Sequence, residues 1–211
     1  MKINNIYIYI YALLGFTSIL LGQNEQSIYS YNDSILKKEN LPISNGLFHY
    51  NSFNIVNNQN IYYKQEKYTV GSVNYLNQKY FDLNIKYVAF NDELIFKPNG
   101  ESEKTGIILY KNNVENFELY DTKFINIEKL ELENTKITGY FEEGFSNSEF
   151  KYLIKHGKIK KDVLSKSTLQ NIFYENETYY VLKNKKIKKI SSKKTIKKLF
   201  PTKKEIINSY F

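Results

Sequence analysis

The sequence contains no cysteine, no tryptophan and no arginine, and Met1 is its only methionine. Without cysteine, the chain cannot form a disulfide framework, a thiolate metal site, an iron–sulfur cluster or a cysteine nucleophile. Without arginine, it has no planar guanidinium to clamp a carboxylate or phosphate through two parallel hydrogen bonds. The glycine-rich nucleotide-binding motifs and the G-x-S-x-G nucleophile elbow are also absent. We therefore predict no catalytic, cofactor-binding or metal-ligating residue.

Histidine is scarce as well, because only His49 and His156 occur. Neither lies in a metal-ligand or catalytic-triad pattern. His49 stands between Phe48 and Tyr50 and is predicted to be packed and hydrogen-bonded. His156 precedes Gly157 and is predicted to lie at the tip of a hairpin.

Aromatic residues are abundant: 20 tyrosines and 14 phenylalanines give 16% of the 211 residues. A chain of this composition is not disordered, and its length suits one domain, with or without a leader. Tyr62-Tyr63 and Tyr179-Tyr180 are candidate stacking platforms for sugars or bases. Packing in the core of a sheet is the preferred interpretation, since tryptophan and methionine are not available to fill it.

Residues 1–22 have the pattern of a signal peptide. Lys2 precedes an uncharged apolar stretch, Ile6–Gly22, and the chain becomes polar from Gln23 onward. We therefore predict export to the periplasm, the outer membrane or the medium, with cleavage between Gly22 and Gln23. An uncleaved membrane anchor is the alternative, since an apolar stretch of about 17 residues is the lower limit for a span. Retention in the cytosol is a third possibility.

The rest of the chain changes character twice. Residues 23–60 are rich in Asn and Ser and are predicted to form a linker or an irregular N-terminal segment. From residue 61 to residue 190, short segments of period two alternate with turn residues, which is typical of an antiparallel sheet. The clearest, "YFDLNIKY", places Phe81, Leu83, Ile85 and Tyr87 on one face and Asp82, Asn84 and Lys86 on the other.

The C-terminus has the period of a helix. In "SSKKTIKKLF" the apolar residues recur at i, i+3 and i+4, with lysines opposite, and Pro201 ends the run. "TKKE" then forms a capping-box pattern for a second helix. The predicted fold is thus α+β and mainly β: a curled or two-layered antiparallel meander, with two short amphipathic helices over residues 191–211 packed on the sheet.

Charge is distributed unevenly. Residues 151–211 carry 17 lysines and 4 acids, whereas residues 23–150 carry 12 lysines and 18 acids. Such a basic cluster favours contact with an anionic lipid, glycan or acidic protein, although it can also be a solvated face or lie against the chain's own acids. The candidate contact residues are Lys185, Lys186, Lys188, Lys189, Lys193, Lys194, Lys197 and Lys198.

Paired carboxylates are the one feature that suggests hydrolysis. Asp92 adjoins Glu93, and Glu142 adjoins Glu143. Neighbouring residues of a strand point to opposite faces, so adjacency alone does not predict a shared site.

Three segments resemble a group of uncharacterised exported proteins of the Bacteroidota, notably flavobacteria: "YFDLNIKYVAFNDELIFKPN" (80–99), "TGYFEEGFSNSEFKYLIKHGKI" (138–159) and "YYVLKNKKIKKISSKKTIKKLFPTKKEIINSYF" (179–211). The resemblance implies an exported β-rich protein and no particular activity. Asp33-Ser34-Ile35 is also similar to the three-residue O-glycosylation signal of that phylum, which makes Ser34 a candidate site.

We expect a non-catalytic exported protein that binds or scaffolds an anionic component of the cell envelope and needs no cofactor. One alternative is an envelope hydrolase that uses carboxylates from different strands. The other is a lysine-rich nucleic-acid-binding protein, which requires a non-functional leader and is disfavoured because arginine is absent. The sequence does not predict an oligomeric state.

Overall fold

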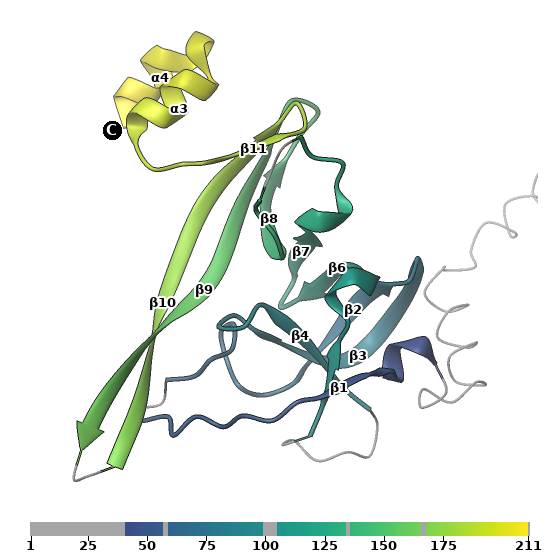
Figure 1. Ribbon diagram of the computed structural model, residues 1–211. Coiled ribbons are helices and arrows are strands. Elements are labelled where there is room, and N and C mark those ends of the chain that lie inside the picture. Colours follow the sequence, from purple (N-terminus) through teal and green to yellow (C-terminus); the bar gives the residue numbers. More distant parts are fainter. Residues whose placement is uncertain (1–40, 57–58, 99–104, 134–135, 166–167, 211) are drawn as a thin grey trace, which may run out of the picture.

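The computed structural model describes residues 41–56, 59–98, 105–133, 136–165 and 168–210. Within them, eleven strands form one antiparallel sheet in the order β1-β5-β4-β3-β2-β6-β7-β8-β9-β10-β11 (Figure 1). The strands are β1 (Gly46–Phe48), β2 (Thr69–Tyr75), β3 (Gln78–Val88), β4 (Glu93–Lys97), β5 (Ile107–Leu109), β6 (Val114–Leu119), β7 (Thr122–Asn126), β8 (Tyr140–Ser146), β9 (Lys151–Ser165), β10 (Thr168–Lys183) and β11 (Lys186–Lys189).

The helical segments are short. They are the 3-10 turns η3 (Pro42–Ser44), η4 (Lys111–Asn113), η5 (Ile127–Lys129) and η6 (Pro201–Lys203), and the helices α3 (Lys193–Leu199) and α4 (Lys204–Tyr210). The prediction of a mainly antiparallel β protein with two short C-terminal helices is confirmed. No helix in the described part of the chain combines the length and apolarity needed to cross a membrane.

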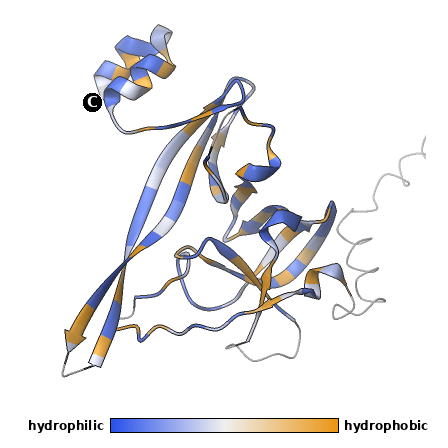
Figure 2. Ribbon diagram, in the orientation of Figure 1, coloured by the Kyte–Doolittle hydropathy of each residue, from blue (hydrophilic) through white to orange (hydrophobic). Residues whose placement is uncertain are grey.

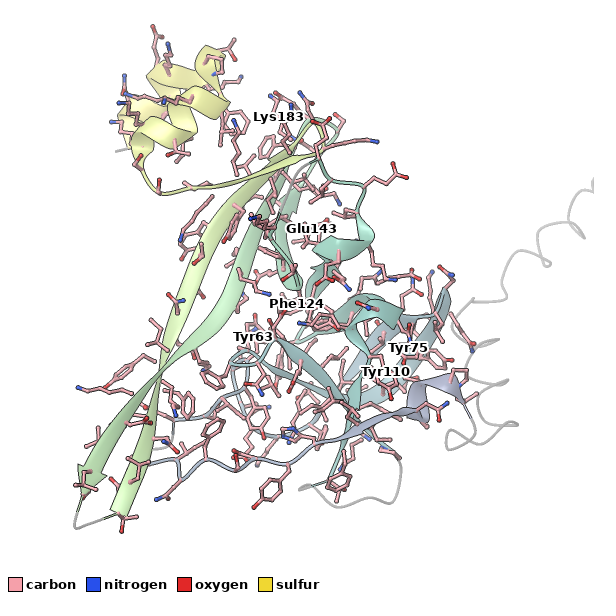
Figure 3. The ribbon with its side chains drawn as sticks, viewed as in Figure 1. Tyr63, Tyr75, Tyr110, Phe124, Glu143 and Lys183 are labelled. Atoms are coloured by element: carbon pink, nitrogen blue, oxygen red, sulfur yellow. The ribbon has the colours of Figure 1, made fainter. Side chains whose placement is uncertain are left out.

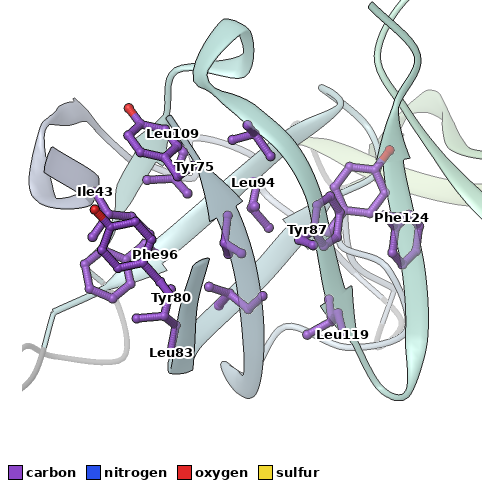
Figure 4. Close-up of a cluster of buried hydrophobic side chains, with 14 of the residues drawn as sticks. Ile43, Tyr75, Tyr80, Leu83, Tyr87, Leu94, Phe96, Leu109, Leu119 and Phe124 are labelled. Carbon is purple, nitrogen blue, oxygen red and sulfur yellow. The ribbon is translucent and has the colours of Figure 1, made fainter. Parts of the chain in front are cut away.

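The sheet curls around a core of aromatic and aliphatic side chains (Figure 4). Tyr75 of β2, Phe96 of β4, Phe117 of β6 and Tyr140 of β8 belong to one buried cluster, although several strands separate them. Neighbouring strands lie about 4.8 Å apart, so side chains spread this widely share a core only if the sheet bends. Tyrosine and phenylalanine do fill the core, as the absence of tryptophan led us to expect.

β3 corrects one detail of the predicted pattern. Alternate residues from Leu83 to Tyr87 are buried as predicted, but Phe81 is not, and Tyr80 is buried in its place. Asp82 has a φ of 51°, and the register with β2 shifts between Gly71 and Val73. This bulge inserts one extra residue into β3, which reverses the faces of the residues before it.

The polar face of β3 is covered in part. Lys86 is only 4% exposed, and its ammonium lies 4.5 Å from the ring centre of Tyr62 and 4.3 Å from that of Tyr68. An aromatic cage of this kind stabilises a buried cation. Tyr62 and Tyr63 are therefore core residues and not exposed platforms.

β9 and β10 form a long hairpin that corrects the prediction for His156. This residue does not lie at a hairpin tip; it pairs with Glu177 in the middle of the β9–β10 ladder, and Gly157 pairs with Asn176. β8 pairs with β9 only as far as Ile154, so the hairpin continues beyond it as a two-stranded arm (Figure 1). The register of β8 with β9 also shifts between Glu143 and Phe145, so β8 contains a bulge at this position.

Residues 41–56 lie along one edge of the sheet. Ile43 is fully buried, and β1 pairs with β5, although about sixty residues of chain separate them. Farther along, Asn54 and Ile55 run beside Asn171 of the arm, where the Asn54 backbone NH donates to the Asn171 side-chain oxygen at 3.0 Å. This N-terminal segment is mostly irregular but is bound to the sheet at both places.

Candidate functional site

The lysine-rich C-terminus forms what we call the basic unit: β11, α3, η6 and α4. β11 pairs with β10 as the last strand of the sheet, whereas the helices α3 and α4 lie beyond the end of β10 and do not cover a face of the sheet (Figure 1). β10 and β11 form a hairpin, whose turn residues Asn184 and Lys185 have φ values of 50° and 58°. Two successive positive φ values fit a two-residue hairpin turn.

The structure divides the eight candidate lysines into two groups. Lys185 and Lys186, at the start of the unit, pair with Glu131 and Glu133 at 3.1 and 3.2 Å. Both pairs are exposed, so each contributes little to stability. They nevertheless show that part of the cationic cluster is balanced by the chain's own acids.

The second group consists of Lys188 and Lys189 on β11 and the four lysines of α3. Lys188, Lys189, Lys194 and Lys198 are exposed, and no carboxylate partner of these four lies within the described residues. Figure 2 shows α3 as a mixture of strongly hydrophilic and hydrophobic positions.

α3 carries its charge in an unfavourable arrangement. Lys193 and Lys197, and likewise Lys194 and Lys198, are four residues apart and share one side of the helix. Like charges at this spacing destabilise a helix by about 0.2–0.5 kcal/mol per pair. No acidic residue occupies the first turn, so two lysines also oppose the helix dipole. The Ser192 side chain caps the helix by accepting a hydrogen bond from the Thr195 NH at 3.3 Å.

The opposite side of α3 attaches the basic unit to the sheet. The ring of Phe200 meets that of Phe150 edge to face at 4.9 Å, and the Lys183 ammonium lies 5.2 Å from the ring centre of Phe200. Figure 3 shows Lys183 at the end of the sheet that faces the helices. The apolar side of α3 therefore faces the protein, while Lys194 and Lys198 are exposed to solvent.

A second candidate cluster surrounds His156. Its Nε2 atom lies 2.6 Å from Glu142 Oε2, and its Nδ1 atom lies 3.4 Å from Glu177 Oε1. The ring packs against that of Tyr63, with 4.7 Å between the centroids. Tyr179 is the exposed member of its tyrosine pair, donates to Glu177 at 2.7 Å and stacks on Tyr152.

The adjacent carboxylates diverge, as the sequence predicted. Glu142 contacts His156, whereas Glu143 is held by Lys151 at 2.5 Å and by Lys123 at 3.5 Å. Burial raises the pKa of Glu143, but the two lysines outweigh burial and hold that pKa below its ordinary value.

Asp92 is the centre of a half-buried ion network. One of its oxygens lies 2.7 Å from Lys155 Nζ and also accepts from the Tyr87 hydroxyl, while the other lies 2.7 Å from Lys111 Nζ. Burial lowers the pKa of Lys155, and the charge of Asp92 opposes that shift. Gly139, with a φ of 90°, passes so close that a Cβ there would lie 1.7 Å from Asp92 Oδ2. Asp92 thus links the turn between β3 and β4 to β9 and to η4.

These carboxylates all have structural partners, and none lines the larger cavities found among the described residues. In the same part of the chain, no three His, Asp or Glu side chains are grouped to hold a metal ion. No observation therefore favours the hydrolase alternative.

His49 is packed and hydrogen-bonded, as predicted: it is 4% exposed, and its Nε2 atom lies 3.1 Å from the Tyr62 hydroxyl. The predicted cleavage site at Gly22 and Gln23 and the candidate glycosylation site Ser34 lie outside the described residues. No protein-family model, no curated protein and no solved structure matches this chain.

Proposed function

We propose that this chain is an exported, non-catalytic protein of the cell envelope that binds an anionic lipid surface through its basic unit. The observation that carries the proposal is α3, whose exposed residues Lys194 and Lys198 form a like-charge pair four residues apart. An anionic surface would remove the repulsion within this pair. The lysines that Glu131 and Glu133 neutralise are not part of this surface.

The apolar residues of the basic unit favour a lipid surface over a soluble polyanion. Ile206 of α4 is 55% exposed, so the basic unit presents an apolar side chain as well as exposed lysines, and this combination suits the interface of a bilayer. A glycan or nucleic acid would use the charge and leave the apolar face in water. The missing arginines also remove the main contact of sequence-specific DNA readers.

Vesicle binding tests the proposal. The protein should sediment with vesicles that contain phosphatidylglycerol and not with pure phosphatidylcholine, and binding should weaken as salt screens the charges. The double variant Lys194→Gln, Lys198→Gln should bind roughly 30-fold more weakly, because each basic residue near such a surface contributes about 1 kcal/mol.

The matched control removes two exposed lysines outside the basic unit, Lys129→Gln and Lys161→Gln. It should bind like the parent protein. Equal losses in the two double variants, or equal binding to neutral vesicles, would refute the proposal. Tighter binding to random-sequence DNA than to the anionic vesicles would favour the nucleic-acid alternative.

A further inference from the structure

A cavity of about 500 Å³ lies between the basic unit and the end of the sheet. Most of its wall is apolar and comes from both sides of the junction. The apolar residues are Phe150, Ile196, Phe200, Pro201 and Ile207, and the polar ones are Glu149, Lys183, Thr202 and Lys203.

The chain forms this cavity because Pro201 ends α3. Proline cannot continue a helix, so the chain makes the η6 turn and returns as α4. Ile196 of α3 and Ile207 of α4 then face the same space, and Phe150 closes it from the sheet. Ile207 is buried although most of α4 is exposed. The helices thus border a space with a mainly apolar wall, and no side chain of the described residues fills this space.

The polar residues of the wall carry a net positive charge. Lys183 forms an ion pair with Glu149 and holds the pKa of that carboxyl below its ordinary value, and the charge of Lys203 contributes to the same shift. Two lysines therefore face one glutamate. One positive charge is left for an anionic group at the cavity.

We propose that this cavity binds a fatty acid, with the acyl chain against the apolar wall and the carboxylate at Lys203. Its volume and its mainly apolar wall with a few charged groups are typical of small-ligand sites. A neutral hydrocarbon would not use the lysine, and a small anion would not use the apolar wall. A fatty acid uses both.

This site is separate from the proposed docking surface. Lys194 and Lys198 do not line the cavity, and the cavity does not require a bilayer. The two proposals can therefore fail independently.

Calorimetric titration with octanoate, decanoate and dodecanoate below their micelle concentrations tests the inference. Affinity should rise about fourfold with each added methylene until the chain fills the cavity. Decyl glucoside, which has the same chain length as decanoate and no charge, should bind at least tenfold more weakly. Lys203→Gln should weaken decanoate binding until it equals that of the glucoside. The absence of saturable binding, or equal affinity for decanoate and decyl glucoside in the parent protein, would overturn the inference.

A pair of tryptophan variants provides the control. Thr202 lines the cavity and is exposed, so Thr202→Trp should fill the space without disturbing the core. Asn208→Trp places the same side chain on α4 outside the cavity wall. Decanoate should bind the second variant and not the first. Retained binding in Thr202→Trp, or equal loss in both, would contradict the assigned site. The Lys194→Gln, Lys198→Gln variant should bind decanoate normally, which separates this test from vesicle binding.

Discussion

His49 contacts the hydroxyl of Tyr62, and the ring of Tyr62 contacts the ammonium of Lys86. Burial is the main reason that the pKa of His49 falls to about 4, and the positive charge of Lys86 lowers it further. Burial also raises the pKa of Tyr62 to about 12, so the phenol stays protonated beside the imidazole. At neutral pH the imidazole of His49 and the phenol of Tyr62 are therefore both uncharged.

This environment makes stability depend on pH. In the unfolded chain His49 binds a proton near pH 6.5, whereas in the fold it does so only near pH 4. Between these values the unfolded state binds more protons, so stability should fall by about 2–3 kcal/mol as the pH drops from 6.5 to 4. Urea unfolding across that range measures the effect. His49→Gln should lack this part of the pH dependence, and an unchanged slope in the variant would contradict the assignment.

In α3, the effect of charge on vesicle binding can be separated from the effect of charge on helix stability. Lys194→Glu places an acid in the first turn and creates a favourable pair with Lys198, so it should stabilise the helix by about 0.5–1 kcal/mol. Lys198→Glu makes the same change of charge at the C-terminal end, where an acid is unfavourable. Because Lys198→Glu also replaces the repulsion with Lys194 by an attraction, hydrogen exchange of the α3 amides should slow more in the first variant than in the second.

Both variants should nevertheless lose binding to anionic vesicles to a similar extent, because each replaces a positive charge with a negative one. If only Lys198→Glu lost binding, helix stability and not charge would account for the interaction.

The elements also show what sequence patterns can and cannot predict. β4 (Glu93–Lys97) is one of the short segments between turn residues that the sequence pattern of residues 61–190 predicts. The bulge at Asp82 was not predictable, since a positive φ at a residue other than glycine leaves no periodic signal. His156 was misplaced because Gly157 resembles a turn residue, and the ladder with β10 that keeps it in a strand is a non-local interaction.

The candidate site was predictable only in part. The lysine cluster is visible in the sequence, and so is its helical spacing. The sequence does not predict which lysines pair with an acid, because Glu131 and Glu133 reach Lys185 and Lys186 from a distant part of the chain. The cavity beside Phe200 was also invisible, since its wall combines residues of the β8–β9 connection with residues of the helices.

In the whole molecule, the uneven distribution of charge along the sequence corresponds to an uneven distribution of charge in space. The basic unit lies at one end of the long hairpin and the arm at the other (Figure 1). An anionic surface would therefore bind the molecule by one end and leave the arm and the acidic part of the sheet away from the surface.

Docking of this kind in the envelope requires export, which the mature N-terminus tests. Mass spectrometry of fractionated cells should find a chain that begins at Gln23 in the periplasmic, membrane or medium fraction. A chain that keeps Met1 in the membrane fraction would indicate an uncleaved anchor. The same chain in the cytosol would contradict export.

The strand order also determines the sequence in which the sheet can assemble. From β2 to β5 and from β6 to β11, each strand pairs with its neighbour in the sequence, so these ladders need only short loops to close. β1 is different, because its partner β5 is synthesised about sixty residues later. Contacts between distant residues form more slowly than local ones. In a chain that enters a compartment with its N-terminus first, β1 would therefore arrive before its partner β5 and would be among the last strands to pair.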